Sequence, residues 1–231
     1  MSKEKFLKSI KNKLIISCQA VDKEPLNNTE ALTLVAKSVI EGGAQALRLS
    51  QLDHITSIMK ITDLPIIGLI KQKYDHFDIV ITPTIKEVED LINIGVKCIA
   101  LDATDRERPQ EDLVFIVEHV KKNYPEILLM ADCSNIQDVE MAIKLQFDFI
   151  GTTLRGYTKD TKDLNNISNN YEFIREILKK SSIPIIAEGG IWEPHQVKEL
   201  MDLGCFAVVV GSAITRPKDI TQRFYNYLGK K

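Results

Sequence analysis

The sequence has few of the features that mark metalloproteins, disulfide-rich proteins or membrane proteins. Its four histidines form no His-x-His or His-x-x-x-His pair, and its four cysteines form no Cys-x-x-Cys pair. Neither residue type therefore has the spacing typical of a transition-metal site. Each cysteine instead lies in or beside an apolar run, which predicts buried free thiols in a reducing compartment. The cysteines are Cys18, Cys98, Cys133 and Cys205.

Long apolar runs and a charge excess of one sign are also missing. No run approaches the ~18 consecutive apolar residues that a membrane span needs. The 30 Lys and Arg residues nearly balance the 32 Asp and Glu residues, so the net charge of -2 predicts no general attraction to nucleic acid or anionic lipid. Basic residues at Lys11 and Lys13 interrupt any apolar core of a secretory leader. We expect a cytoplasmic protein.

Short apolar runs alternate with segments of helical spacing along the whole chain. Because the runs are continuously apolar, they are typical of parallel strands that are covered on both faces. Eight runs followed by eight helical segments predict a single (β/α)8 TIM barrel over residues 1–231. The runs are Leu14–Cys18, Ala44–Leu49, Pro65–Ile70, Lys97–Leu101, Ile127–Ala131, Phe147–Gly151, Pro184–Ala187 and Ala207–Val210.

The helical segments have recognisable ends in several places. Thr29–Glu41 is followed by two glycines, and Pro109 suits the first turn of a helix that reaches Asn123. Two connections, 72–81 and 156–170, are longer than the usual two to six residues of a βα loop. We expect both at the C-terminal face of the barrel, where active sites of this fold lie.

Polar side chains follow most of the predicted strands at the same relative position. In a barrel these side chains converge on the axis, so Arg48, Lys71, Asp132 and Glu188 become candidates for one site. A lysine that loses part of its hydration can act as a base near neutral pH. A lysine after a strand is also often a solvated loop residue, and the nearby carboxylates would favour its charged form.

The segment 183–217 predicts a phosphate site. It contains two apolar runs that end in small residues, Gly190 in the first and Gly211-Ser212 in the second. Small residues let backbone N–H groups approach an anion, and barrel enzymes commonly bind phosphate after strands seven and eight. We therefore expect Gly190, Gly211 and Ser212 to bind phosphate.

These residues lie in motifs that resemble the N-acetylmannosamine-6-phosphate 2-epimerases of bacterial sialic acid catabolism. The resemblance covers nearly the whole chain. The motifs are Ile-Ile-Ser-Cys-Gln-Ala at 15–20, Gly-Leu-Ile-Lys at 68–71, Ala-Leu-Asp-Ala-Thr at 100–104, Met-Ala-Asp at 130–132, Ile-Gly-Thr-Thr-Leu-Arg-Gly-Tyr at 150–157, Ile-Ala-Glu-Gly at 186–189 and Gly-Ser-Ala-Ile-Thr-Arg-Pro at 211–217. Gly190 and Arg155 depart from the residues common in that family.

The resemblance implies an isomerase that needs no cofactor and inverts C2 of N-acetylmannosamine 6-phosphate to give N-acetylglucosamine 6-phosphate. It assigns catalysis to Lys71 and Glu188 and substrate binding to a further set of residues. That set is Gln19, Arg48, Asp132 and Arg216. Asp132 would hold Lys71 in place or bind a sugar hydroxyl. Glu188 would orient the N-acetyl group, or act as a second acid; we favour the orienting role.

Other interpretations of the sequence stay open. A strand-end lysine also suits a Schiff-base aldolase. A pentulose-phosphate epimerase would share the phosphate site, although its usual histidine ligands are missing. A barrel that binds without catalysis is a third alternative. The resemblance implies a homodimer, for which Phe224, Tyr225 and Tyr227 could supply contacts, but we expect these aromatic residues on the buried face of the last helix.

Overall fold

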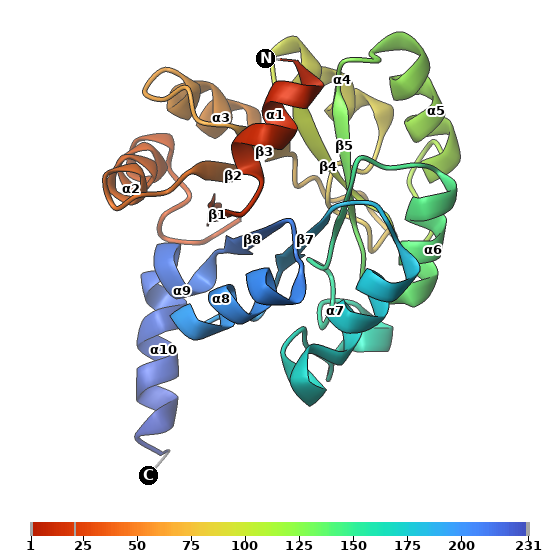
Figure 1. Ribbon diagram of the computed structural model, residues 1–231. Helices are drawn as coiled ribbons and strands as arrows, with labels where there is room; N and C mark the ends of the chain where they lie inside the picture. The colour runs from red at the N-terminus through yellow and green to blue at the C-terminus, as the bar shows by residue number, and fades with distance from the viewer. Residues whose placement is uncertain (1, 21, 230–231) are drawn as a thin grey trace.

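Eight parallel strands form a closed barrel in the computed structural model, which describes residues 2–20 and 22–229 (Figure 1). Each strand pairs with the next one in sequence, and β8 pairs with β1, so the predicted (β/α)8 barrel is confirmed. The strands are β1 Lys13–Cys18, β2 Ala46–Ser50, β3 Ile66–Leu69, β4 Cys98–Asp102, β5 Leu128–Asp132, β6 Phe149–Gly151, β7 Ile185–Glu188 and β8 Ala207–Val210.

Helices surround this barrel, and α2 matches its predicted bounds at both ends. The helices are α1 Lys3–Ile10, α2 Thr29–Glu41, α3 Leu52–Met59, α4 Ile85–Asn93, α5 Leu113–Asn123, α6 Ile136–Lys144, α7 Ser168–Lys180, α8 Pro194–Leu203, α9 Ser212–Thr215 and α10 Pro217–Tyr227, with a 3-10 turn at Lys159–Thr161. In the described part of the chain, none of these helices is long and apolar enough to cross a membrane.

The predicted start of α5 is wrong. The helix begins at Leu113, not at Pro109, because the Asp112 side chain accepts a hydrogen bond from the Phe115 N–H group at 2.7 Å and caps the helix there. Upstream, the buried Arg108 donates to the carbonyl of Pro83 at 3.1 Å, which ties the preceding segment to the barrel as a loop.

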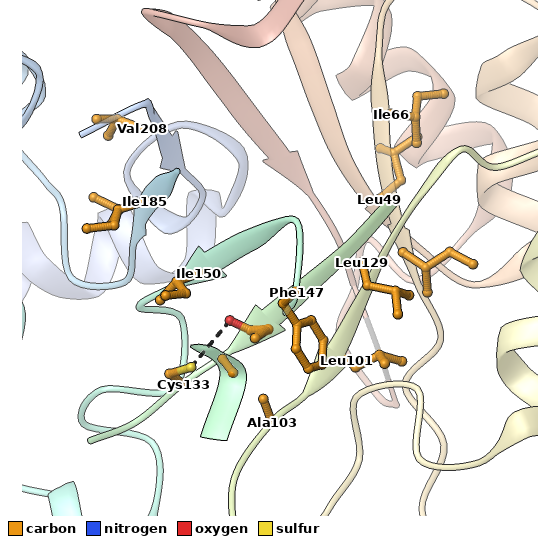
Figure 2. Close-up of a cluster of buried hydrophobic side chains, with 14 of the residues drawn as sticks. Leu49, Ile66, Leu101, Ala103, Leu129, Cys133, Phe147, Ile150, Ile185 and Val208 are labelled. Atoms are coloured by element: carbon orange, nitrogen blue, oxygen red, sulfur yellow. Dashed lines mark hydrogen bonds between the residues drawn. The ribbon is translucent and has the colours of Figure 1, made fainter. Parts of the chain in front are cut away.

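The strands bury alternate side chains in two separate layers. Side chains of one parity face the helices, and Figure 2 shows part of this outer layer, with Leu49, Leu101, Leu129 and Ile150 among its members. Side chains of the other parity fill the barrel interior. All four cysteines are buried free thiols, as predicted from the sequence. Burial on both faces explains why the runs are continuously apolar.

The N-terminal helix α1 contributes to the interior layer. Phe6 and Ile10 lie one turn apart on α1, are almost completely buried, and belong to the same cluster as Ile15, Cys98 and Phe149. These strand residues stand early in β1, β4 and β6, so α1 closes the N-terminal end of the barrel. The opposite, C-terminal end is left for the site.

Candidate active site

A cavity of about 650 Å³ opens at the C-terminal ends of the strands. It is lined by side chains from all parts of the chain, so the barrel brings together residues that are far apart in sequence. Of the residues predicted for the site, all except Asp132 line it: Gln19, Arg48, Lys71, Glu188, Gly190, Gly211, Ser212 and Arg216. The two long loops also reach it, through Asp78 and Tyr157 among others.

Strand alternation explains why the charged groups point into the barrel. On β2, Ala46 belongs to the interior cluster, and Arg48 follows it by two residues. Likewise Glu188 follows the interior residue Ile186, and Lys71 follows Leu69. In each case the strand points apolar side chains into the barrel interior, and the next inward-facing residue, at the end of the strand, is charged.

Arg48 is the centre of a buried ion cluster. Its guanidinium nitrogens lie 3.1 and 2.5 Å from the two carboxylate oxygens of Asp132, and Nη1 lies 3.0 Å from Oε2 of Glu188. Burial by itself disfavours the charge of Arg48, but Asp132 and Glu188 outweigh burial and raise its pKa. The two carboxyl groups therefore keep the Arg48 guanidinium charged and fixed in place at the cavity wall.

Asp132 does not take the position that we expected from the sequence. Its carboxylate is completely buried behind Arg48 and also accepts a hydrogen bond from Thr153 Oγ1 at 2.6 Å. With both oxygens engaged and no share in the cavity lining, Asp132 is not placed to bind a sugar hydroxyl. Its partner is Arg48, not Lys71.

Glu188 has a pKa that burial raises to about 7. The positive charge of Arg48 opposes this shift, and the negative charge of Asp132 adds to it. Thr153 Oγ1 lies 3.2 Å from the same Glu188 oxygen that contacts Arg48. Because its pKa lies near neutrality, Glu188 can gain or lose a proton under ordinary conditions.

Lys71 shows the opposite shift. Burial and, after it, the positive charges of Arg216 and Arg48 lower its pKa to about 8, although Glu188 and Glu24 act in the other direction. A lysine with such a pKa is substantially neutral at mildly alkaline pH. Lys71 and Glu188 line one cavity, and both side chains titrate near neutral pH.

The predicted phosphate residues gather on one side of the cavity, at the ends of β7 and β8. Gly190 has a positive φ of 70°, which other residues adopt only with strain. A Cβ atom on Gly211 would come within 3.3 Å of Ser17 Cβ, so a side chain there would crowd the cavity wall. Helix α9 begins at Ser212, and beyond it Arg216 forms an ion pair of 3.0 Å with Glu24.

Gln19 lies at the end of the first strand, on the cavity wall. Its Nε2 donates to Ser17 Oγ at 2.8 Å, and both side chains are largely buried. Within the residues that the structure describes, no group of three or more His, Cys, Asp or Glu side chains could hold a metal ion. The charged groups that line the cavity include the amine of Lys71, the carboxylate of Glu188 and the guanidinium groups of Arg48 and Arg216.

Several residues that line the cavity were assigned no role from the sequence. Thr153 stands inside the Gly-Thr-Thr motif, so the motif was a usable signal for it. Asp102 and Arg106, whose side chains pair at 2.6 Å, line the wall beside β4, and Asp102 has the strand-end position that predicts a candidate. Gln51 also lines the cavity, but no sequence pattern marks it.

Comparison with known proteins supports the fold and the family resemblance. A family model described as "Putative N-acetylmannosamine-6-phosphate epimerase" matches residues 32–230. The chain belongs to the N-acetylmannosamine-6-phosphate epimerase family. The resemblance of the motifs to this family is thereby confirmed.

Relatives named as N-acetylmannosamine-6-phosphate 2-epimerases match over almost their full length. One from Malacoplasma penetrans, whose name carries the qualifier "Putative", is 58% identical over 98% of this chain and 99% of the relative. One from Mycoplasma mycoides, with the same qualifier, is 55% identical over 91% and 93%. A solved N-acetylmannosamine-6-phosphate 2-epimerase from Clostridium perfringens superposes with a TM-score of 0.90 at 41% identity, covering 96% of this chain and 95% of that one.

Proposed function

We propose that this member of the epimerase family interconverts N-acetylmannosamine 6-phosphate and N-acetylglucosamine 6-phosphate by moving the proton at C2. The observation that carries the proposal is the pairing of Lys71 and Glu188 in one cavity, with pKa values of about 8 and about 7. If the intermediate stays in place, inversion at one carbon needs a base on one face and an acid on the other. Two groups that both titrate near neutrality can supply these roles in either direction.

The chemical step begins with removal of the C2 proton from the open-chain aldehyde. The electrons of the C–H bond move toward C1, and the aldehyde oxygen gains negative charge as an enolate forms. In one direction neutral Lys71 takes the proton and protonated Glu188 delivers one to the opposite face; the reverse direction uses the Glu188 carboxylate and the Lys71 ammonium. Arg48, which lines the same cavity and contacts Glu188, would stabilise the enolate.

This assignment makes Glu188 the second acid, and not only the group that orients the N-acetyl substituent. A carboxyl that merely accepts hydrogen bonds would gain nothing from a raised pKa. Burial raises the pKa of Glu188 to about 7 despite its contact with Arg48, which supports a role in proton transfer. Asp132, from its position behind Arg48, would keep the guanidinium charged and oriented.

The phosphate group would occupy the β7–β8 side of the cavity. Gly190, Gly211 and Ser212 offer close backbone approach there, and Arg216 adds a positive charge. In the structure Arg216 pairs with Glu24, so a phosphate would compete with this carboxylate for the guanidinium. Gln19, on the neighbouring strand end, is placed to contact the sugar chain.

We also infer that the protein acts as a homodimer in the cytoplasm. The expectation that Phe224, Tyr225 and Tyr227 form a buried face of the last helix is wrong: they are 71%, 64% and 93% exposed. No residue of α10 is buried, and Figure 1 shows the helix extending away from the barrel. An amphipathic helix with its aromatic side chains in solvent supports a second copy of the chain as the group that covers it.

The proposal is tested by following deuterium from D2O into C2 of N-acetylmannosamine 6-phosphate. Lys71→Ala removes the amine and should reduce both exchange and epimerisation by at least ~10³-fold. Glu188→Gln keeps the shape of the side chain but cannot carry a proton. The variant should therefore retain a larger fraction of the exchange rate at C2 than of the epimerisation rate. Lys60→Ala, at an exposed lysine outside the cavity, should behave as the wild type. Undiminished exchange in Lys71→Ala would eliminate Lys71 as the base.

A further inference from the structure

The backbone of Lys71 has an unusual partner. Strand β3 ends at Leu69, so Lys71 lies beyond the regular ladder. Its N–H group donates to Oε1 of Gln51 at 2.8 Å, and its carbonyl accepts from Nε2 of Gln51 at 3.2 Å. A single side-chain amide therefore satisfies both backbone groups of the proposed base.

The other side of this segment explains why the amide is needed there. Lys71 forms an antiparallel bridge with Ile81, but the hydrogen bonds of that bridge belong to the flanking residues. Gln72 N–H donates to Val80 O at 3.0 Å, and Thr82 N–H donates to Ile70 O at 2.7 Å. Lys71 thus directs its own N–H and C=O away from Ile81, toward β2, and β2 has already ended at Ser50.

Gln51 reaches this place through an unfavourable backbone conformation. Its φ is 69° and its ψ is 135°, a combination that is close to the region adopted almost only by glycine. Its N–H still donates to Leu69 O at 3.1 Å, which continues the β2–β3 pairing by one residue. A glycine would adopt this backbone without strain, so folding alone gives no reason for a glutamine. The side chain supplies the reason.

We propose that Gln51 is a positioning residue for Lys71. The inference rests on the proposed function, in which Lys71 moves the C2 proton. Gln51 holds the Lys71 backbone at the cavity edge, so that the amine stays in the buried position where its pKa is lowered. Misplacement of a reacting group by about 1 Å can reduce a rate by ~10²-fold, whereas binding of the phosphate on the far side is unaffected.

The decisive variant is Gln51→Gly, because it removes the amide and relieves the backbone strain together. We expect a midpoint of thermal unfolding equal to or above that of the wild type. The rate of C2 exchange and kcat should both fall about tenfold, while KM changes by less than about twofold. The alkaline limb of the pH profile should also move to higher pH, since a less buried Lys71 has a higher pKa.

Two further variants complete the experiment. Gln51→Glu still accepts from the Lys71 N–H but brings a negative charge, so its pH profile should move to higher pH. Gln45→Ala, at an exposed glutamine just before β2, is the matched control and should leave all measurements unchanged. A Gln51→Gly enzyme with the wild-type kcat and pH profile overturns the positioning role, as does a loss confined to KM. Absence of C2 exchange in the wild type would instead refute the proposed function.

Discussion

At the scale of single residues, the site depends on two opposite pKa shifts that have a common origin. Burial destabilises the charged form of both Lys71 and Glu188, so the amine becomes more acidic and the carboxyl less acidic. Their pKa values approach each other, at about 8 and about 7. The pair can then hold one proton, on either member, over the same narrow pH range.

This arrangement predicts a bell-shaped pH profile for kcat/KM. Below about pH 7 both groups are protonated and no base is present, and above about pH 8 both are deprotonated and no acid is present. Activity should therefore be greatest between these values and fall about tenfold per pH unit outside them. Steady-state rates across the range, with stability checked at each pH, measure this.

The Glu188→Gln variant gives the matching control for the profile. It removes one of the two titrating groups and should abolish one limb of the bell in whatever activity remains. A wild-type profile that stays flat across both pKa values would contradict the shared-proton interpretation.

The sequence indicated which side chains point toward the barrel axis, but not how deep along the axis each of them lies. Strand-end position correctly placed Lys71, Arg48 and Glu188 at one cavity, because period-two alternation sends such side chains to the barrel axis. It did not show that Asp132 lies beneath Arg48, since depth along the axis depends on the stagger of neighbouring strands. Gln51 was not identified from the sequence, because its orientation depends on a positive φ that no residue pattern encodes.

At the scale of elements, strands were easier to predict than helix ends. Continuous apolar runs are distinctive, and each predicted run overlaps the observed strand. Helix ends depend on local competition between capping groups: Asp112 begins α5, although Pro109 was an equally acceptable first residue. The role of α1 was also missed, even though Phe6 and Ile10 have the spacing of one buried helical face.

Helix α1 should contribute measurably to the stability of the barrel. Phe6 is 1% exposed and packs in the interior cluster, so Phe6→Ala would leave a cavity at the N-terminal end of the barrel. We expect a loss of about 3–5 kcal/mol in the free energy of unfolding, measured by denaturant titration. Lys5→Ala, at an exposed position on the same helix, should cost less than about 0.5 kcal/mol. Equal losses for the two variants would show that α1 does not seal the barrel.

At the scale of the whole molecule, the residues that stabilise the closed barrel and the charged residues of the cavity occupy different regions. Apolar layers and α1 occupy the N-terminal end and the outer shell, while the charged groups gather at the C-terminal end. Because every strand contributes to both ends, the positions of the charged groups are set by the register of the entire sheet. Helix α10 belongs to neither region, since it adds no buried side chain to the barrel.

The exposed face of α10 predicts the assembly state. Solvent-exposed aromatic residues on a helix are costly to leave uncovered, and a second copy of the chain would bury them by twofold symmetry. We expect light scattering to give the mass of a dimer for the wild type, and that of a monomer for Phe224→Asp combined with Tyr227→Asp. Phe115→Asp, at a half-exposed phenylalanine on α5, is the matched control and should remain dimeric. A wild type that is monomeric at micromolar concentration, or a double variant that stays dimeric, would show that α10 is not the interface.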